Sequence, residues 1–350
     1  MLLEEASSWM QGLAGRGAAN QSLVSVIIPC RNGAAFIREA IDSVLRQTFQ
    51  SIEVVVVDDA STDESWSIIV AYGDALISVR NDRQRGACYS RNLGRSQASG
   101  QFLMFLDSDD YIEPDTIASL VNAMSEGEAS ITTADWRFLM NTPQGWVAAD
   151  SGFSREPPQG DFVRGWISGW YIPPCAMLWR RSAFDAIGGW DQSLAANQDG
   201  ELVLRALLAG QRITKARGGL ALYRKQPGSE STISNSATRE AVTSRLSVLV
   251  SLEEKLESAG LLENYRFELG RSYYSLARLA YLVDVRTGEE SENRAWKLAG
   301  RRAASGTLSH RLGASLLGLR RKERLAKSVR AGIRGLRSSV GWRRQHSAAH

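Results

Sequence analysis

Short apolar runs alternate with amphipathic segments between residues 24 and 124 of the chain. Four strands are predicted where apolar and β-branched residues cluster: 24–28, 53–57, 76–79 and 101–106. Four helices are predicted where apolar side chains recur at helical spacing or helix-start residues occur: 34–47, 61–72, 86–98 and 114–124. Alternating strands and helices with short connections predict an α/β fold with a parallel sheet that is covered by helices on both faces.

Individual residues set the expected limits of these elements. Pro29 follows the first apolar run and is expected to end it. The helix at 61–72 is expected to begin at Ser61, because Ser61-Thr-Asp-Glu64 has the pattern of a capping box. The second strand is continuously apolar after Glu53, so it is expected to be buried on both faces of the sheet.

The pattern is less regular after residue 130. Strands are predicted near 130–134 and 176–179, and a helix over 199–208. From about residue 238, leucines recur at helical spacing and predict a helical region. Four parts are therefore expected along the chain: a leader (1–22), an α/β domain (23–235), a helical region (236–305) and a basic amphipathic tail (306–350).

Composition indicates a folded protein and narrows the possible chemistry. The 350 residues are 43% hydrophobic and 23% charged. The three cysteines form no CxxC pair, which argues against a disulfide scaffold or a zinc site and favours a reducing compartment. All three histidines lie at or after residue 310, so an active site built on histidine is excluded from the main body of the chain.

Charge is distributed unevenly along the chain. Residues 301–350 carry 13 Lys or Arg and one acid, a net charge of +12, whereas the preceding residues carry 29 basic and 37 acidic side chains, a net charge of −8. Mixed basic and apolar residues suit a helix that lies on an anionic membrane; a solvated tail is the alternative. No recognition motif supports binding to nucleic acid.

The chain is expected to stay in the cytoplasm. Its first residues include acids where a signal peptide needs bases, and no apolar run reaches the roughly 18 residues of a membrane span. Together with the basic tail, these features predict a cytoplasmic protein with peripheral contact to the inner face of the membrane.

Acidic residues gather where the strand at 101–106 is expected to end. Asp107, Asp109 and Asp110 lie within four residues, and a hard cation would relieve their mutual repulsion. Mg²⁺ or Mn²⁺ takes few protein carboxylates and completes its coordination with water and substrate phosphates. The cluster therefore predicts a metal site that holds a diphosphate. An acidic turn that caps the helix at 114–124 is the alternative.

Asp58 and Asp59 end the second predicted strand, where ligands bind in sheets of this kind. An acidic residue at this position can also hold a ribose in a dinucleotide-binding fold. The first strand is followed by Pro29-Cys-Arg-Asn-Gly-Ala34, however, and not by G-x-G-x-x-G. A P-loop pattern is missing as well. A dehydrogenase and a P-loop enzyme are therefore disfavoured.

Five motifs resemble those of family 2 glycosyltransferases, which are inverting enzymes with a GT-A fold, and they occur in the same order. They are Val24–Asn32, Val57–Asp63, Ser90–Gly94, Phe105–Asp110 and Gly188–Asp191. A sixth feature, Gln198-Asp199, resembles the late carboxylate that precedes a helix in this family. The resemblance covers roughly residues 23–235 and implies a mixed, mainly parallel sheet that is flanked by helices, followed by a helical C-terminal extension.

The resemblance implies a role for each matched polar residue. The residues implied to hold the nucleotide or its phosphates are Pro29, Arg31, Asn32, Asp59, Arg91 and Asp107. Asp59 would accept a hydrogen bond from a uracil ring, and Asp109 and Asp110 would hold Mg²⁺ or Mn²⁺. Asp199 would be the general base that deprotonates the acceptor hydroxyl, a contribution of about 10²–10⁴-fold.

Three positions depart from the family pattern. Arg31 stands where the residue is often aromatic, Gln198 stands where Glu commonly precedes the base, and Gln226 stands where His is usual. A guanidinium plane can still stack on a base. Gln198 lowers the local negative charge and leaves Asp199 as the candidate base. Gln226 implies that any metal or phosphate contact made by that histidine is weaker here or comes from elsewhere.

The resemblance implies an enzyme that transfers one sugar from a nucleotide diphosphate donor, such as a UDP-sugar, to a hydroxyl of a saccharide or lipid-linked acceptor. Synthesis of a cell-envelope polysaccharide or a glycolipid is the implied setting. Aromatic side chains either pack in the core or line the acceptor pocket: Trp166, Trp170, Tyr171 and Trp179. A nucleotide-binding oxidoreductase and a catalytically inactive scaffold are the alternatives. Intact Asp59, Asp109 and Asp199 argue against the second.

Overall fold

The computed structural model describes residues 23–150, 156–225 and 238–328. The chain divides into two compact units. The first unit comprises Met1–Val163, Trp170–Leu194 and Gln198–Ser229. The second unit comprises Arg164–Gly169, Ala195–Asn197 and Glu230–His350.

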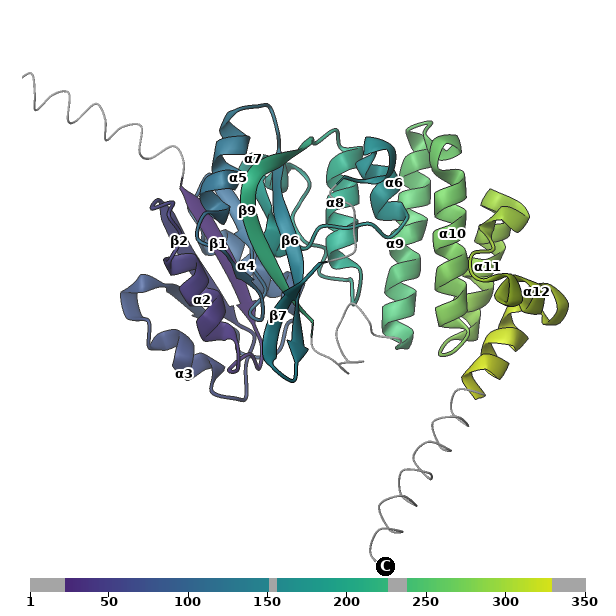
Figure 1. Cartoon of the computed structure of the whole chain (residues 1–350), viewed down its shortest axis with the longest axis horizontal. Helices are drawn as coiled ribbons and strands as arrows, with labels where there is room; N and C mark the ends of the chain where they lie inside the picture. The colour runs from purple at the N-terminus through teal and green to yellow at the C-terminus, as the bar shows by residue number, and fades with distance from the viewer. Residues whose placement is uncertain (1–22, 151–155, 226–237, 329–350) are drawn as a thin grey trace, which may run out of the picture. The chain divides into compact units, whose positions relative to one another are not determined.

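A mixed sheet forms the centre of the first unit (Figure 1). Its described strands are β1 (Val24–Cys30), β2 (Ile52–Asp58), β3 (Ile77–Arg80), β4 (Phe102–Phe105), β5 (Tyr111–Ile112), β6 (Ile131–Thr142), β7 (Gly145–Ala149), β8 (Met177–Arg180) and β9 (Ile213–Lys225). They are ordered β3-β2-β1-β4-β8-β6-β9-β5, and β7 pairs with β6. Strands β3, β2, β1 and β4 run parallel, β8 is antiparallel to both of its neighbours, and β6 is parallel to β9.

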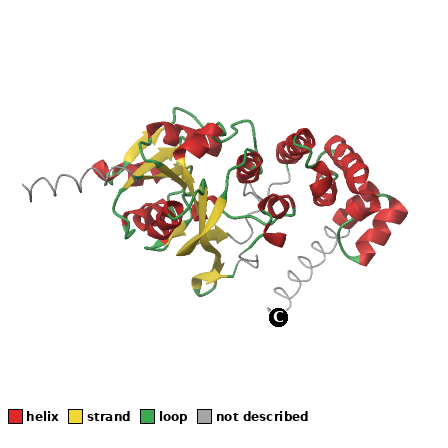
Figure 2. Ribbon diagram, turned by 90° about the horizontal axis from the view of Figure 1, so that it is seen from above, coloured by secondary structure: helices red, strands yellow, loops and turns green. Residues whose placement is uncertain are grey.

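Helices flank this sheet, and the described C-terminal residues are helical. The helices of the first unit are α2 (Ile37–Leu45), α3 (Ser65–Val70), α4 (Ala87–Gln97), α5 (Thr116–Ser125), α7 (Arg181–Ala186) and α8 (Gln198–Leu208). Helix α6 (Phe162–Ile167) contributes residues to both units. The second unit contains α9 (Arg239–Ser258), α10 (Leu262–Ala280), α11 (Val285–Ala299), α12 (Leu308–Leu317) and a helix over 319–328. Figure 2 shows helices and no strand in the described part of that unit after residue 238. The predicted α/β class and helical C-terminal region are confirmed.

The central strands are buried as their composition predicts. Every residue of β1 is buried, and Val54–Val57 of β2 are at most 3% exposed. Parallel strands that are covered on both faces read as continuous apolar runs, and β2 fits that description. No described helix combines the length and apolar character that crossing a membrane requires.

Two of the expected limits are wrong. Pro29 lies inside β1, which continues to Cys30, because the Cys30 carbonyl still accepts a hydrogen bond from the loop after β2. Helix α3 begins at Ser65 and not at Ser61. The Ser61 hydroxyl accepts the backbone N–H of Asn32 at 2.9 Å, so it ties two loops together instead of capping a helix.

Gly94 allows α4 to pack directly on the sheet. A Cβ atom at this position would lie 2.5 Å from Ile27 Cγ2 and 3.3 Å from Val57 Cγ2, and both valine and isoleucine are fully buried. We therefore expect Gly94→Ala to lower the free energy of unfolding by about 1–3 kcal/mol, as overpacking of a dense core does. Urea denaturation would measure the change. Gly127→Ala is the matched control, because no atom lies within 4 Å of its added Cβ; equal losses in the two variants would contradict the steric explanation.

Candidate active site

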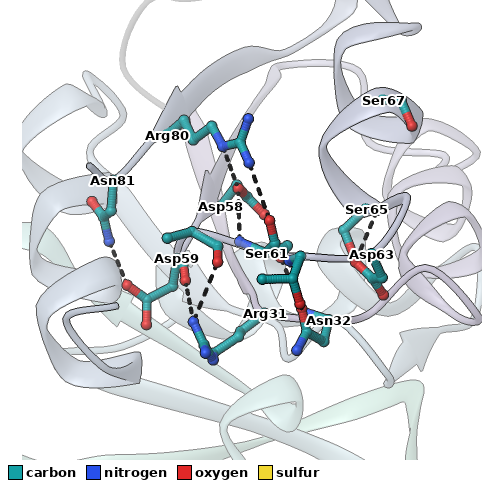
Figure 3. A network of polar contacts seen from close by, with 12 residues as sticks. Arg31, Asn32, Asp58, Asp59, Ser61, Asp63, Ser65, Ser67, Arg80 and Asn81 are labelled. Carbon is teal, nitrogen blue, oxygen red and sulfur yellow. Dashed lines mark hydrogen bonds and ion pairs between the residues drawn. The ribbon is translucent and has the colours of Figure 1, made fainter. Parts of the chain in front are cut away.

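The loops after β1 and β2 are joined by hydrogen bonds at one edge of the sheet (Figure 3). Arg31 Nη1 donates to the carbonyl oxygen of Asp59 at 2.8 Å. The backbone N–H of Asn32 donates to Ser61 Oγ, and Asn32 Oδ1 accepts the N–H of Thr62, both at 2.9 Å. Arg31 and Asn32 are nevertheless exposed, so they form an ordered polar rim that a ligand can reach.

The Asp59 carboxylate is buried and organises the loop that leads into α4. Asn81 Nδ2 and the N–H of Arg85 donate to its Oδ1, each at 2.7 Å, and the N–H of Gly86 donates to its Oδ2 at 2.8 Å. A carboxylate offers about four acceptor positions. Protein donors therefore take most of the acceptor capacity of Asp59, and little is left for the predicted contact with a base.

Arg91 connects three segments of the site. Its buried guanidinium lies 4.4 Å from the centre of the Trp190 ring, and its Nη2 donates to Asp107 Oδ1 at 2.6 Å. Its Nη1 lies 3.5 Å from Gln198 Oε1. Burial lowers the pKa of Arg91, but the carboxylates of Asp107 and Asp199 outweigh that effect and raise it, so the guanidinium stays charged.

Asp107, Asp109 and Asp110 form an acidic segment after β4. The surroundings of Asp109 and Asp110 disfavour the charged forms of these two side chains. Burial, with the nearby charge of Asp107, raises the pKa of Asp109 to about 6. Burial also raises the pKa of Asp110 well above its ordinary value, and the charges of Asp109 and Asp107 add to the shift. Carboxylates in this arrangement are unfavourable until a proton or a cation neutralises them.

The acidic segment does not cap the next helix. Strand β5 separates Asp110 from α5, and the residue at the N-terminus of α5 is Asp115, whose side chain makes no capping hydrogen bond. The capping alternative is therefore wrong.

Arg224 on β9 holds the acidic segment in position by hydrogen bonds. Its backbone N–H donates to Asp110 Oδ1 at 2.8 Å, and its Nε donates to the carbonyl oxygen of Asp109 at 2.6 Å. The guanidinium lies 4.3 Å from the ring centres of both Phe36 and Trp146. In contact with two rings that are nearly perpendicular to each other, and hydrogen-bonded to the loop, Arg224 holds the backbone that carries the acidic side chains.

Asp109 and Asp110 are the residues that fit a divalent metal ion. Apart from the thiol of Cys175, which lies beside it, the buried Oδ2 of Asp110 has no hydrogen-bond partner among the described residues. No group of three or more His, Cys, Asp or Glu side chains among those residues could hold a metal by itself. A cation at this position would therefore need oxygen ligands from water or a substrate, as Mg²⁺ and Mn²⁺ commonly do.

Asp199 lies in the first turn of α8, close to the Arg91–Asp107 pair. Burial raises its pKa; Arg91 opposes the shift and Asp107 adds to it. A carboxylate whose pKa is raised is a better proton acceptor than an ordinary aspartate. The environment of Asp199 therefore suits a general base.

A partly exposed aromatic cluster lies beside these carboxylates. The Trp136 ring centre is 5.3 Å from those of Phe138 and Tyr171 and 6.2 Å from that of Tyr223. Burial and the charge of Asp199 raise the pKa of Tyr171 to about 12, which links the cluster to the candidate base. Rings of this kind suit the faces of sugars.

Of the aromatic residues considered from the sequence, Tyr171 alone belongs to this cluster. Trp179 is 1% exposed and packs on Phe184, and Trp170 is buried against Phe162. Trp166 belongs to the second unit. Core packing is therefore the role of Trp179 and Trp170.

The structure gathers the predicted site residues into two groups. The rim and loop group holds Arg31, Asn32 and Asp59, with Pro29 buried inside β1. The acidic group holds Arg91, Asp107, Asp109, Asp110 and Asp199. Gln226 lies outside the described residues.

Sequence reasoning missed Arg224 and the contact made by Trp190. Trp190 lies in the Gly188–Asp191 motif, so a signal was present, although its partner Arg91 was not evident. Arg224 lies two residues before Gln226, in a stretch that resembles the family, but its contacts with the acidic segment were not evident.

Comparison with known proteins finds relatives for part of the first unit. The family model described as "Glycosyl transferase family 2" matches residues 25–188. An uncharacterized glycosyltransferase of Rickettsia prowazekii is 32% identical over 185 residues, 51% of this chain and 57% of that protein. Glycosyltransferase GlyA of Streptococcus pneumoniae is 27% identical over 255 residues, 67% of this chain and 36% of that protein. The chain thus spans between about a third and three fifths of the length of these curated relatives.

Solved structures share the fold. Residues 1–349 of S. aureus TarS, in complex with UDP-GlcNAc, superpose with a TM-score of 0.62 at 20% identity, covering 89% of this chain and 92% of that one. GalNAc-T7 with UDP, GalNAc and Mn²⁺ gives a TM-score of 0.55 at 16% identity, covering 79% and 56%. At these identities the similarity establishes the fold.

Proposed function

We propose that the chain is a glycosyl transferase of family 2, whose model matches residues 25–188, and that it transfers a sugar from a nucleotide diphosphate donor to an acceptor hydroxyl. The donor proposed is a UDP-sugar, because the related folds of TarS and GalNAc-T7 bind UDP. The acceptor proposed is a saccharide or a lipid-linked precursor in polysaccharide or glycolipid synthesis. The family match argues against the oxidoreductase alternative.

The nucleotide is proposed to bind at the rim formed by the loops after β1 and β2. The exposed Arg31 and Asn32 are held in place by backbone hydrogen bonds and can contact a base or a ribose. Asp59 supports this surface by ordering the 81–86 loop, and its remaining acceptor position is available to a base N–H. Arg91, charged and fixed by Asp107, supports binding of the diphosphate by its positive charge.

The acidic segment is proposed to meet the diphosphate through a divalent metal. Asp109 and Asp110 would hold Mg²⁺ or Mn²⁺, and Arg224 keeps their loop in position. When bound, such an ion neutralises charge that develops on the leaving diphosphate.

Asp199 is proposed to act as the general base of a single displacement. It takes the proton from the acceptor hydroxyl while that oxygen bonds to the anomeric carbon of the sugar. The bond from this carbon to the diphosphate oxygen breaks on the opposite side, and the nucleoside diphosphate leaves. Attack from the face opposite the leaving group inverts the anomeric configuration. The raised pKa of Asp199 supports this role.

The observation that carries the proposal is the convergence of the acidic segment, Arg91 and Asp199 at the sheet edge within a family 2 domain. Arg91 interacts electrostatically with both Asp107 and Asp199, which supports a single site for the proposed phosphate contact and the proposed base.

The four-part division of the chain, with limits at 22, 235 and 305, remains part of the proposal.

A thermal-shift screen of nucleotide-sugars tests the proposal. With Mn²⁺ present, we expect one UDP-sugar to stabilise the protein by about 2.7 kcal/mol at a concentration 100 times its Kd. Chelation of the metal should remove most of that stabilisation. ADP- and GDP-sugars serve as matched controls. A protein that no nucleotide-sugar stabilises, with or without metal, would contradict the proposal.

The protein is further proposed to work in the cytoplasm, in peripheral contact with the inner face of the membrane. A lipid-linked acceptor would lie at that surface, and the C-terminal residues carry the excess of basic charge that an anionic surface attracts.

A further inference from the structure

The most exposed large apolar side chains of the described residues lie close together near the C-terminus. In decreasing order of exposure they are Leu316 (83%), Leu308 (71%), Leu325 (55%) and Leu312 (54%). Leu308, Leu312 and Leu316 are spaced four residues apart on α12, so they form a stripe on one face of that helix. Adjacent exposed apolar side chains of this kind mark a site of interaction with a protein or a membrane. We call Leu308, Leu312 and Leu316 the leucine stripe.

The opposite side of α12 is fixed to the second unit. His310 is buried, and its Nε2 lies 3.0 Å from the hydroxyl of Tyr274 on α10. In the helix that follows, Leu319 is 2% exposed and Glu323 accepts a hydrogen bond from Arg278 Nε at 2.9 Å. The two helices are therefore anchored by one face, and the leucine stripe is left on the other.

Exposed basic side chains surround the stripe. Arg311 follows Leu308 by three residues and precedes Leu312 by one, and it is exposed. Further exposed basic residues in the next helix are Arg320, Arg321, Arg324 and Lys327. Glu323 is the only acid in residues 301–350, and it is buried. Arg320 forms an ion pair with the exposed Glu289 of α11 at 3.0 Å. The other exposed ionisable side chains of residues 301–328 are all basic, so the exposed surface of this segment is apolar and mainly positive.

We propose that this surface docks on an anionic lipid bilayer, with the leucine stripe among the acyl chains and the arginines on the lipid phosphates. A second copy of this chain that paired through the same surface would bring the same positive charge and be repelled. Residues 329–350 carry five arginines and no acid, so they lack the charge to complement the surface as well. A nucleic acid would match the charge but leave the leucines exposed. A negatively charged lipid surface satisfies both features.

Flotation of the full-length protein with lipid vesicles tests this inference. With vesicles of about 30% phosphatidylglycerol in phosphatidylcholine, we expect wild type to float and binding to fall as salt is raised. The variant Leu308→Ser, Leu312→Ser, Leu316→Ser should bind about tenfold or more weakly. The single variant Leu316→Ser should lose part of the binding, and it removes the most exposed of the three side chains, so its folding is the least affected.

Matched controls distinguish binding through this surface from non-specific binding by other exposed apolar side chains. The variant Leu45→Ser, Val70→Ser, Val147→Ser removes three apolar side chains that are 44–49% exposed in the first unit, and it should float like wild type. The variant Arg311→Gln, Arg321→Gln, Arg324→Gln should bind anionic vesicles more weakly than wild type does. Its binding to vesicles of phosphatidylcholine without anionic lipid should not change. Far-UV circular dichroism melts confirm that each variant is folded.

Other results would overturn the inference. Flotation of the leucine variant equal to wild type would reject a role for the stripe. Loss of self-association in that variant, measured by light scattering without lipid, would assign the stripe to contact between copies of the chain. The inference deepens the proposed membrane location. Because flotation measures binding and not transfer, its failure would leave the transferase proposal standing.

Discussion

Asp199→Asn is expected to lower the rate of sugar transfer by about 10²–10⁴-fold while leaving donor binding largely intact. Asparagine has nearly the shape of aspartate but cannot take the acceptor proton. The proposed nucleotide contacts, Arg31 and Asn32, lie on other loops and do not depend on Asp199. Initial rates with the donor found in the thermal-shift screen measure the loss, and the stabilisation by that donor reports its binding.

The same substitution at an exposed position serves as the control. Asp74 lies in the short helix Gly73–Ala75 and is exposed, so Asp74→Asn should transfer sugar at the wild-type rate. Turnover of Asp199→Asn at the wild-type rate would remove Asp199 from the mechanism. A parallel loss of donor stabilisation would instead indicate that Asp199 supports the site structurally through Arg91.

Apolar runs were sufficient to locate the strands that are buried on both faces. Strands β1, β2, β3, β4 and β8 lie within about two residues of their predicted limits. In β1, β2, β4 and β8, burial on both faces leaves no polar alternation, so these sequences are recognised without knowledge of a partner strand. Strand β3 is partly exposed and was located by its cluster of apolar and β-branched residues.

Of the remaining described strands, only the start of β6 was predicted, near residues 130–134; the rest of β6 and strands β5, β7 and β9 were not. Strand β9 is interrupted by Gly218 and Gly219, both with positive φ, and it carries several charged residues. It remains extended because β6 pairs along most of its length, across a register shift between Thr133 and Asp135. That pairing is a tertiary effect, and neither strand encodes it locally.

The residues of the candidate site likewise divide into those that the sequence predicted and those that it did not. The acidic segment was predicted because its carboxylates lie at a strand end. Asp199 was predicted because Gln198-Asp199 resembles the late carboxylate of the family. Arg224 was not, because its partners Glu39, Asp109 and Asp110 lie 185, 115 and 114 positions away along the chain. A side chain whose role arises from distant contacts leaves no local pattern to read.

Asp109→Asn is expected to abolish metal-dependent stabilisation by the donor and to lower transfer by at least about 10²-fold. The variant keeps the size of the side chain but loses the negative charge that would hold the cation. Arg224 still positions the loop, because it contacts the backbone carbonyl of Asp109 and not its carboxylate. Thermal shifts with UDP and Mn²⁺, together with initial rates, measure the two effects.

The stability of the metal-free protein distinguishes a metal-binding carboxylate from a structural one. The pKa of Asp109 is raised from 3.8 to about 6 in the folded protein, so the folded state binds this proton more tightly than the unfolded state. Ionising Asp109 therefore costs stability, which falls as pH rises from about 4 and is lowest above about 6. Without metal, Asp109→Asn should be at least as stable as wild type at pH 7.5, and this advantage should shrink toward pH 4. A variant that is much less stable at pH 7.5, yet keeps its response to Mn²⁺, would show that the carboxylate supports the fold and that the metal binds elsewhere.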